Sequence, residues 1–146
     1  MTVLVSRSLR RLSRKYILCL ARSLPLITSD WVAEILLVLH GSSGSVSQKQ
    51  LSGQLEIDES RIVTMIRELT ILQLIEVAIN PEDRREHMLT LTNKGQQMVV
   101  KIREAIDMVN HHLSQGLSTE QLHSFFEVIQ RMEGNLNHCG HLKQRK

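Results

Sequence analysis

Two adjacent arginines, Arg84 and Arg85, follow Asp83 within the stretch NPEDRREHMLTLTNKG, which runs from Asn80 to Gly95. A guanidinium group is permanently charged and presents N–H donors in a planar fork that matches phosphate groups and base edges. These residue types therefore favour binding of a nucleic acid over bond-making chemistry. Two arginines at a solvated turn also occur simply as solubilising charge, so the surrounding elements must decide between the two interpretations.

The arginines lie at the expected tip of a β-hairpin. Residues 74–79 form a short apolar run, and Asn80-Pro81 is a turn signal that stops a helix or a central strand. Beyond the tip, the residues fit the two-residue alternation of a β-strand best. His87, Leu89 and Leu91 would lie on one face of the strand, and Met88, Thr90 and Thr92 on the other. Helical periodicity begins after Thr92. The stretch predicts a basic hairpin that runs directly into a helix, a shape suited to lie along DNA.

Residues 48–72, upstream of the hairpin, have helix-turn-helix spacing. A short helix is expected over 48–55, a turn at Glu56-Ile57, and a longer helix from about Asp58, the expected N-cap, to Leu72. Four residues of the second helix are expected to face the core: Ile62, Val63, Ile66 and Leu69. Its opposite face carries Ser60, Arg61, Thr64, Arg67 and Glu68, side chains suited to base edges. Such a face alone is more often solvated than functional, but a basic hairpin directly after a helix-turn-helix is much rarer.

Several short sequence motifs occur together along the chain. They are Thr28-Ser29-Asp30-Trp31, Leu51, Ile62-Val63 with Leu69, Leu74-Ile75, Asp83-Arg84-Arg85, Leu91-Thr92 and Lys94-Gly95. With them, the segment from about Leu26 to Gly95 resembles the winged helix-turn-helix of the MarR family of bacterial transcription regulators, and most closely its SlyA branch. The Asp-x-Arg tip followed by Leu-Thr-x-x-Gly is the specific part. The resemblance continues through residues 116–122 and so covers nearly the whole chain.

Three positions depart from the family pattern. Gln73 stands where the family usually has Gly, so we expect Gln73 to accept a left-handed backbone. Val77 stands where Arg is usual, which removes a charge that could brace the wing or touch phosphate. Thr64 replaces a basic residue of close relatives, so contacts at this point of a site should be weaker or differently specific.

The resemblance also implies roles in DNA binding. It assigns Arg85 to the minor groove, Asp83 to orienting Arg85 through a charge-assisted hydrogen bond, and Arg84 to a position nearer phosphate. The second helix of the motif would enter the major groove, with contacts to bases or phosphates from Ser60, Arg61, Thr64 and Arg67. Ser47 and Gln48, at the start of the preceding helix, would bind phosphate. The expected partner is double-stranded DNA with a pseudo-palindromic site.

Apolar seams outside the motif predict a homodimer. They comprise Leu9, Leu12, Tyr16 and Leu20 near the N-terminus, Met98, Val99, Ile102, Ile106, Val109 and Leu113 in residues 93–115, and Leu122, Phe125, Ile129, Met132 and Leu136 after a capping box at Ser118 and Gln121. A lobe of this size cannot cover so many seams alone, although an intrachain bundle is the alternative. The expected fold is mainly α (α+β). A winged helix-turn-helix DNA-binding lobe at 26–95 lies between an N-terminal dimerisation helix at 1–25 and C-terminal dimerisation helices at 96–146.

A small-molecule effector is a further implication of the resemblance. Relatives often bind an aromatic carboxylate or phenol between the dimerisation helices and the DNA lobe. Arg11 and Arg14 would neutralise the carboxylate here, while Ser29 and Trp31 would line the cavity. Ile35 replaces a polar residue of close relatives, and aromatic residues make up only 3% of the chain. An equally good interpretation places Trp31 in the core and leaves the two arginines solvated or facing DNA.

The 146-residue chain carries a net charge of +3, and its basic residues are concentrated at the two ends. Arg7, Arg10, Arg11, Arg14, Lys15 and Arg22 all precede the first acidic residue, Asp30, while Lys143, Arg145 and Lys146 close the chain. Such a start can also be an organelle transit peptide, but the resemblance makes it the first helix of the fold. The apolar run at 17–21 is too short to span a membrane. We expect a cytoplasmic, nucleoid-associated bacterial protein.

Enzymatic and metal-binding functions find little support in the sequence. It contains no Gly-rich phosphate loop and no Ser, His and Asp arrangement, so no catalytic residue and no cofactor are expected. His111-His112 and the segment 138–141 lack a second ligand cluster, so no metal site is expected. Cys19 and Cys139 offer no disulfide framework, and the apolar neighbours of Cys19 favour an inert buried thiol over a redox sensor.

These observations favour a dimeric, sequence-specific DNA-binding transcription regulator. The alternatives are a nonspecific architectural or silencer-displacing DNA-binding protein and a winged-helix protein-interaction module.

Overall fold

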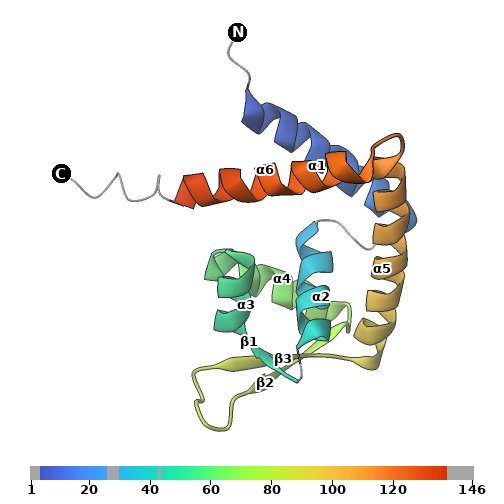
Figure 1. Cartoon of the computed structure of the whole chain (residues 1–146). Coiled ribbons are helices and arrows are strands. Elements are labelled where there is room, and N and C mark those ends of the chain that lie inside the picture. Colours follow the sequence, from blue (N-terminus) through green and yellow to red (C-terminus); the bar gives the residue numbers. More distant parts are fainter. Residues whose placement is uncertain (1–3, 26–29, 43, 138–146) are drawn as a thin grey trace, which may run out of the picture. The chain divides into compact units, whose positions relative to one another are not determined.

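A computed structural model of the chain describes residues 4–25, 30–42 and 44–137 (Figure 1). Its elements are α1 (Val5–Ser23), α2 (Asp30–Gly41), β1 (Val46–Ser47), α3 (Gln48–Leu55), α4 (Glu59–Ile71), β2 (Ile75–Ile79), β3 (His87–Leu91), α5 (Asn93–Ser114) and α6 (Thr119–Asn137). The chain divides into a compact unit over Met1–Val109 and a second over Asn110–Lys146. The predicted mainly helical class with a small sheet is confirmed. No described helix has both the length and the apolar character needed to cross a membrane.

The sheet has three antiparallel strands in the order β1-β3-β2, and β2 and β3 form the predicted hairpin. Val77 pairs with Leu89, and Ile79 pairs with His87 nearer the tip. β1 is only two residues long, whereas β2 and β3 have five residues each. The hairpin therefore continues beyond β1, and its loop projects from the body of this unit (Figure 1).

α3 and α4 form the predicted helix-turn-helix, with α3 at the predicted bounds. Glu56 ends α3 in the left-handed conformation with φ 51°. Asp58 occupies the predicted N-cap position of α4, but its carboxylate does not accept the capping hydrogen bond expected of an N-cap side chain. The Asp58 carbonyl accepts from Arg61 N at 3.0 Å and from Ile62 N at 3.1 Å, so the backbone bonds of the helix begin at this residue.

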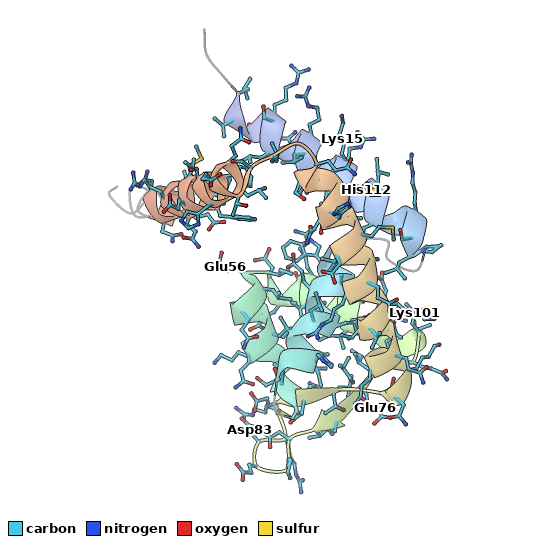
Figure 2. The ribbon with its side chains drawn as sticks, turned by 45° about the vertical axis from the view of Figure 1, so that its right-hand side comes forward. Lys15, Glu56, Glu76, Asp83, Lys101 and His112 are labelled. Atoms are coloured by element: carbon cyan, nitrogen blue, oxygen red, sulfur yellow. The ribbon has the colours of Figure 1, made fainter. Side chains whose placement is uncertain are left out.

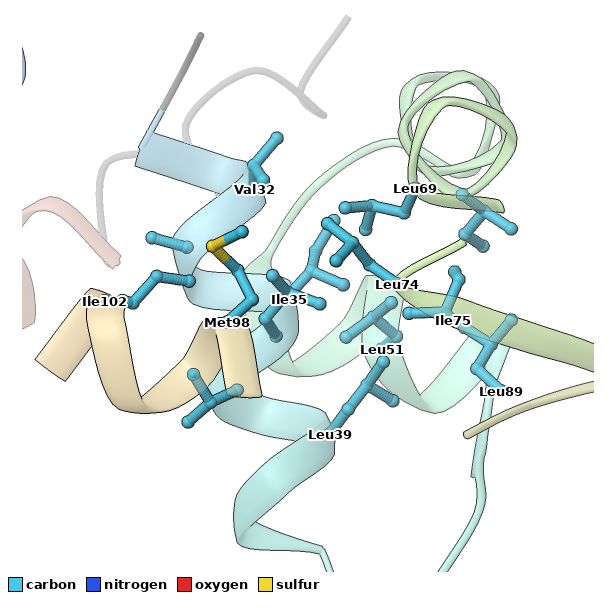
Figure 3. Packing of buried hydrophobic residues seen from close by; sticks show 14 of the residues in the cluster. Val32, Ile35, Leu39, Leu51, Leu69, Leu74, Ile75, Leu89, Met98 and Ile102 are labelled. Carbon is cyan, nitrogen blue, oxygen red and sulfur yellow. The ribbon is translucent and has the colours of Figure 1, made fainter. Parts of the chain in front are cut away.

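One apolar core joins α2, α3, α4, α5 and the sheet. Its fully buried side chains include Ile35, Leu36, Leu51, Ile62, Leu69, Leu74, Ile75, Leu89, Val99 and Ile102, many of which converge in Figure 3. Ile62, Ile66 and Leu69 are buried as predicted, but Val63 is 50% exposed, so its assignment to the core is wrong. Val63 lies about 100° around the helix from Ile62, which takes it beyond the edge of the buried stripe.

A hydrogen-bonded junction joins the end of α4, the base of the hairpin and the start of α5. Thr92 Oγ1 donates to the Gln73 carbonyl at 2.7 Å and accepts from Gly95 N at 2.9 Å. Lys94 Nζ donates to the Leu72 carbonyl at 2.8 Å. Gln73 has φ 60°, which confirms the predicted left-handed backbone. The Leu-Thr-x-x-Gly pattern therefore fixes the hairpin to the last turn of α4.

α5 packs into the core through Met98, Val99, Ile102, Ala105 and Val109. Leu113, which was expected on the same face, is 47% exposed, so for this residue the apolar pattern overestimates burial within one chain. Near the end of α1, Leu20 is buried, and Tyr16 and Cys19 pack against the core. Burial raises the pKa of the Tyr16 phenol, and its electrostatic interactions with Asp107 and Cys19 act in the same direction. The phenol therefore stays neutral at physiological pH.

α6 begins with the predicted capping box, in which Ser118 Oγ accepts from Gln121 N at 3.2 Å and Gln121 Oε1 accepts from Ser118 N at 2.9 Å. None of its side chains is buried within the described chain. Exposed apolar side chains of α6 are Phe125, Phe126, Val128, Met132 and Leu136. Leu9 and Leu12 on α1 are also exposed.

Candidate nucleic-acid interface

The outward face of α4 carries the polar residues that the sequence singled out. Ser60, Arg61, Thr64 and Arg67 are all exposed, because the buried stripe of α4 lies on the opposite side. Thr64 Oγ1 donates to the Ser60 carbonyl at 3.3 Å, so this hydroxyl stays close to the helix backbone. The two guanidinium groups can reach much farther than the hydroxyls, and Glu68 adds a negative charge to the same exposed surface.

The loop between β2 and β3 is braced by its own side chains. Asn80 N donates to the Glu86 carbonyl at 2.9 Å, and Asn80 Nδ2 donates to Glu86 Oε2 at 2.8 Å. Asp83 Oδ1 accepts from Arg85 N at 3.0 Å, and Glu86 N donates to the Asp83 carbonyl at 2.9 Å. Figure 2 shows Asp83 at the outer end of this loop. A projecting loop closed in this way holds its backbone in one shape without support from the core.

Arg84 and Arg85 are both exposed at this tip. The Asp83 carboxylate bonds the backbone N–H of Arg85, whereas the sequence interpretation had this carboxylate orient the Arg85 side chain. A carboxylate bond to a backbone N–H is charge-assisted as well. Asp83 thus sets the direction in which the Arg85 side chain leaves the backbone, and the guanidinium group remains free to meet a ligand.

The start of α3 differs in detail from the sequence prediction. Ser47 is only 1% exposed, and it forms a capping box in which Ser47 Oγ accepts from Gln50 N at 3.1 Å and Gln50 Oε1 accepts from Ser47 N at 2.9 Å. Gln48 is half-buried, and Lys49 is exposed beside it. Lys49 was not among the residues predicted from the sequence to contact DNA. A lysine directly after Gln48, a predicted phosphate contact, could have indicated it.

Three segments that were predicted separately meet around one surface pocket of about 300 Å³. Its lining consists of Gln48 and Lys49 from α3, Glu59 from α4, and Asp83, Arg85, Glu86 and His87 from the hairpin. The start of the helix-turn-helix and the arginine-bearing tip therefore share one side of this unit. A second, open groove of about 470 Å³ runs between α4 and the hairpin, with Gln48 and His87 also in its lining.

The residues proposed for a small effector are only partly described. Arg11 and Arg14 are exposed on α1, and Trp31 is half-buried and packs against the core. Ser29 lies outside the described residues, as does the segment 138–141. Cys19 is a half-buried free thiol. Within the described part of the chain, no group of three or more His, Cys, Asp or Glu side chains is arranged to hold a metal ion.

Comparisons with known proteins show which fold has this arrangement of helices and hairpin. Residues 29–95 match the family described as winged helix DNA-binding domain. The crystal structure of MarR superposes with a TM-score of 0.78 at 20% identity, covering 93% of this chain and 99% of MarR. The chain has the MarR fold.

Two further structures with this fold were determined with ligands. The transcriptional repressor CouR, bound to a 23-mer DNA duplex, matches with a TM-score of 0.80 at 20% identity, covering 89% of this chain and 92% of CouR. The PcaV transcriptional regulator from Streptomyces coelicolor, in complex with its natural ligand, matches with a TM-score of 0.79 at 23% identity, covering 92% of this chain and 98% of PcaV. The winged helix-turn-helix predicted from the sequence is thus confirmed as a fold.

Proposed function

We propose that this protein is a dimeric, sequence-specific DNA-binding transcription regulator of the MarR type, within the SlyA-like branch, which acts on the bacterial nucleoid. The observation that carries the proposal is the pocket that brings together the start of α3, the start of α4 and the exposed Arg85 of the hairpin. For a helix to enter the major groove while a basic hairpin enters the neighbouring minor groove, the helix-turn-helix and the hairpin tip must lie next to each other. The family match over 29–95 and the DNA-bound state of CouR support it.

In this proposal α4 is the recognition helix. Its exposed Ser60, Arg61, Thr64 and Arg67 meet base edges or phosphates in the major groove. Arg61 and Arg67 extend farthest from the helix, so they supply most of the affinity. Thr64 reads a neighbouring base only at short range, because its hydroxyl is bonded to the Ser60 carbonyl.

The hairpin acts as the wing and lies over the flanking minor groove. Arg85 enters the groove, where a narrow A·T-rich segment concentrates negative potential, and Arg84 contacts phosphate. Asp83 holds the backbone at Arg85 in place. Gln48 and Lys49 bind phosphate at the start of α3, while Ser47 positions that helix through its capping box.

Dimerisation would place two DNA-binding lobes, one from each chain, on one duplex. We infer that α1, α5 and α6 of two chains interdigitate, because α6 buries none of its side chains within its own unit and Leu9 and Leu12 of α1 are exposed among the described residues. Residues 1–25 and 96–146 thus form the dimerisation domain, and 26–95 form the DNA-binding lobe. Two recognition helices about 34 Å apart would enter successive major grooves of a pseudo-palindromic site.

A small aromatic carboxylate or phenol is the proposed effector, with Arg11, Arg14, Ser29 and Trp31 around it. PcaV, which has this fold, was crystallised with its natural ligand. The effector changes DNA affinity only through its different affinities for the DNA-competent and incompetent states. Trp31 is the only tryptophan of the sequence, so its fluorescence during titration with benzoate or salicylate reports binding near α2 directly.

Selection of bound fragments from a genomic library, followed by footprinting, tests the proposal. We expect half-sites related by twofold symmetry and centred about one helical turn apart. Uniform binding to any A·T-rich duplex, with a steep dependence on salt, would instead indicate an architectural or silencer-displacing protein. A purified protein that binds no DNA would indicate a protein-interaction module.

A further inference from the structure

The recognition helix carries an exposed apolar side chain at its centre. Val63 is 50% exposed, and it lies one turn from Ser60 on one side and one turn from Arg67 on the other. Val63 lies outside the buried core, and valine has a lower helix propensity than alanine. Its apolar surface is therefore available for a ligand of this helix.

Val63 forms one wall of the open groove between α4 and the hairpin. The groove is lined by Gln48, Val63, Ile66, Arg67, Thr70, Ile71, Val77 and His87. The opposite wall is Val77 of β2, which is 39% exposed and shares a sheet face with the buried Ile75. Because the hairpin projects past the helices, the core-facing side of β2 remains uncovered here. The groove therefore combines apolar side chains with Arg67 and His87 in one lining.

We infer that this groove receives the edge of a DNA strand, and that Val63 contacts the 5-methyl group of a thymine in the major groove. The inference rests on the proposed function and adds a specificity-determining residue to it. A thymine methyl is the apolar group that base pairs present on the major-groove edge, and small apolar side chains are its usual partners. Val63 selects a thymine that no polar residue of α4 identifies.

Continuity with the DNA-binding surface favours DNA over a peptide in this groove. Gln48 and His87 line both this groove and the pocket that carries Arg85, so one strand that passes from α4 to the hairpin tip would cross both. Arg67 and His87 also line the groove, and both can donate hydrogen bonds to a phosphate backbone that passes beside the apolar side chains. An apolar peptide would leave these two polar side chains without partners.

Replacement of single thymines by deoxyuridine in the selected site tests the inference, because this change removes one methyl group and nothing else. At one position in each half-site we expect the affinity of the native protein to fall about fourfold, the effect of one buried methyl group. Val63→Ala should bind the thymine site more weakly by a similar factor. At that same position, deoxyuridine should then cause no further loss in Val63→Ala.

Val100→Ala is the matched control, because Val100 is similarly exposed but lies on α5. It should retain the full sensitivity to deoxyuridine. Val63→Ala should melt at the same temperature as the native protein or slightly above it, since Val63 is half-exposed and alanine has the higher helix propensity. Equal deoxyuridine sensitivity of native protein and Val63→Ala at every position would overturn the inference while leaving sequence-specific binding intact. Loss of sequence-specific binding by the native protein itself would overturn the proposed function.

Discussion

Arg85 combines a constrained backbone with an unconstrained side chain. The Asp83 carboxylate and the Asn80–Glu86 bonds hold the loop, and the guanidinium group extends from a fixed point into solvent. Pre-organisation of this kind reduces the entropy that a contact with DNA must offset. The tip bonds use main-chain groups of Arg85, so a substitution at this residue leaves them in place.

Arg85→Ala should therefore weaken specific DNA binding without changing the fold. We expect a loss of about 1 to 3 kcal/mol, the scale of one good side-chain contact to DNA. Titration of the selected site at fixed salt measures this loss. Arg103→Ala, on an exposed position of α5, removes the same charge elsewhere and should leave specific affinity nearly unchanged. Equal affinities for Arg85→Ala and the native protein would remove Arg85 from the interface.

Gln73 is a second residue whose backbone limits its choice of side chain. With φ 60° it adopts a left-handed conformation, which costs a non-glycine residue about 1 to 2 kcal/mol. Glycine has an entropy cost of about 0.5 to 1 kcal/mol, so Gln73→Gly should raise the free energy of unfolding by roughly 0.5 to 1 kcal/mol. Urea denaturation measures the difference.

Gln97→Gly is the control for this prediction, because Gln97 is exposed within α5 and its backbone is helical. There the same substitution should lower the free energy of unfolding by about 1 kcal/mol. A destabilising Gln73→Gly would show that the Gln73 side chain has a stabilising role that outweighs its backbone strain.

Sequence patterns identified element types well and single side chains less well. The left-handed Gln73 was predictable because the MarR family, which the sequence resembles, usually has glycine at this position. Val63 was misassigned, since a residue about 100° from the centre of an apolar stripe can lie on either side of its edge. Ser47 matched the pattern of a polar helix start, but only the structure shows that its hydroxyl is buried in a capping box.

At the scale of elements, the junction of α4, β2 and α5 determines the position of the wing relative to the recognition helix. Gly95 is buried where α5 begins, and a Cβ at this position would collide with the Leu74 carbonyl oxygen. That carbonyl also accepts from Thr92 N at 3.1 Å. Close approach of two backbones is therefore what requires glycine here, although its φ is helical.

Gly95→Ala should lower the free energy of unfolding by about 3 kcal/mol or more, because neither backbone can move without breaking the junction. Gly53→Ala, in α3 with open space around the added Cβ, should instead raise it by roughly 0.5 to 1 kcal/mol. Thermal or urea denaturation of the two variants compares the same chemical change in the two settings. Two equal effects would mean that Leu74 and Gly95 separate easily.

For the whole molecule, the proposed function depends on a partner chain. The helix-turn-helix and the wing were predictable because turn signals and periodicity act within a few residues. The pairing of chains stays a prediction, because the seam Leu122, Phe125, Ile129, Met132 and Leu136 favours a homodimer but is also compatible with an intrachain bundle. Within its own unit, Asn110–Lys146, α6 buries none of its side chains, so its apolar seam needs cover from outside that unit.

Phe125→Asp should dissociate the proposed dimer, since it replaces an exposed aromatic side chain of the seam with a carboxylate that is costly to bury. Loss of one buried Phe corresponds to about 3 kcal/mol, so we expect the dimer dissociation constant to rise about 100-fold or more. Sedimentation equilibrium measures this constant. Gln130→Asp, at an exposed position outside the seam, introduces the same charge and should leave the dimer intact.

DNA binding by the same variants separates assembly from recognition. A monomeric Phe125→Asp retains its wing and recognition helix, so it should bind a single half-site with native affinity but lose the advantage of the second half-site. A full site with two half-sites should then be bound little better than one half-site. If Phe125→Asp is monomeric yet binds the full site as tightly as the native protein, the twofold arrangement of recognition helices is wrong. If it stays dimeric, the interface lies on other helices.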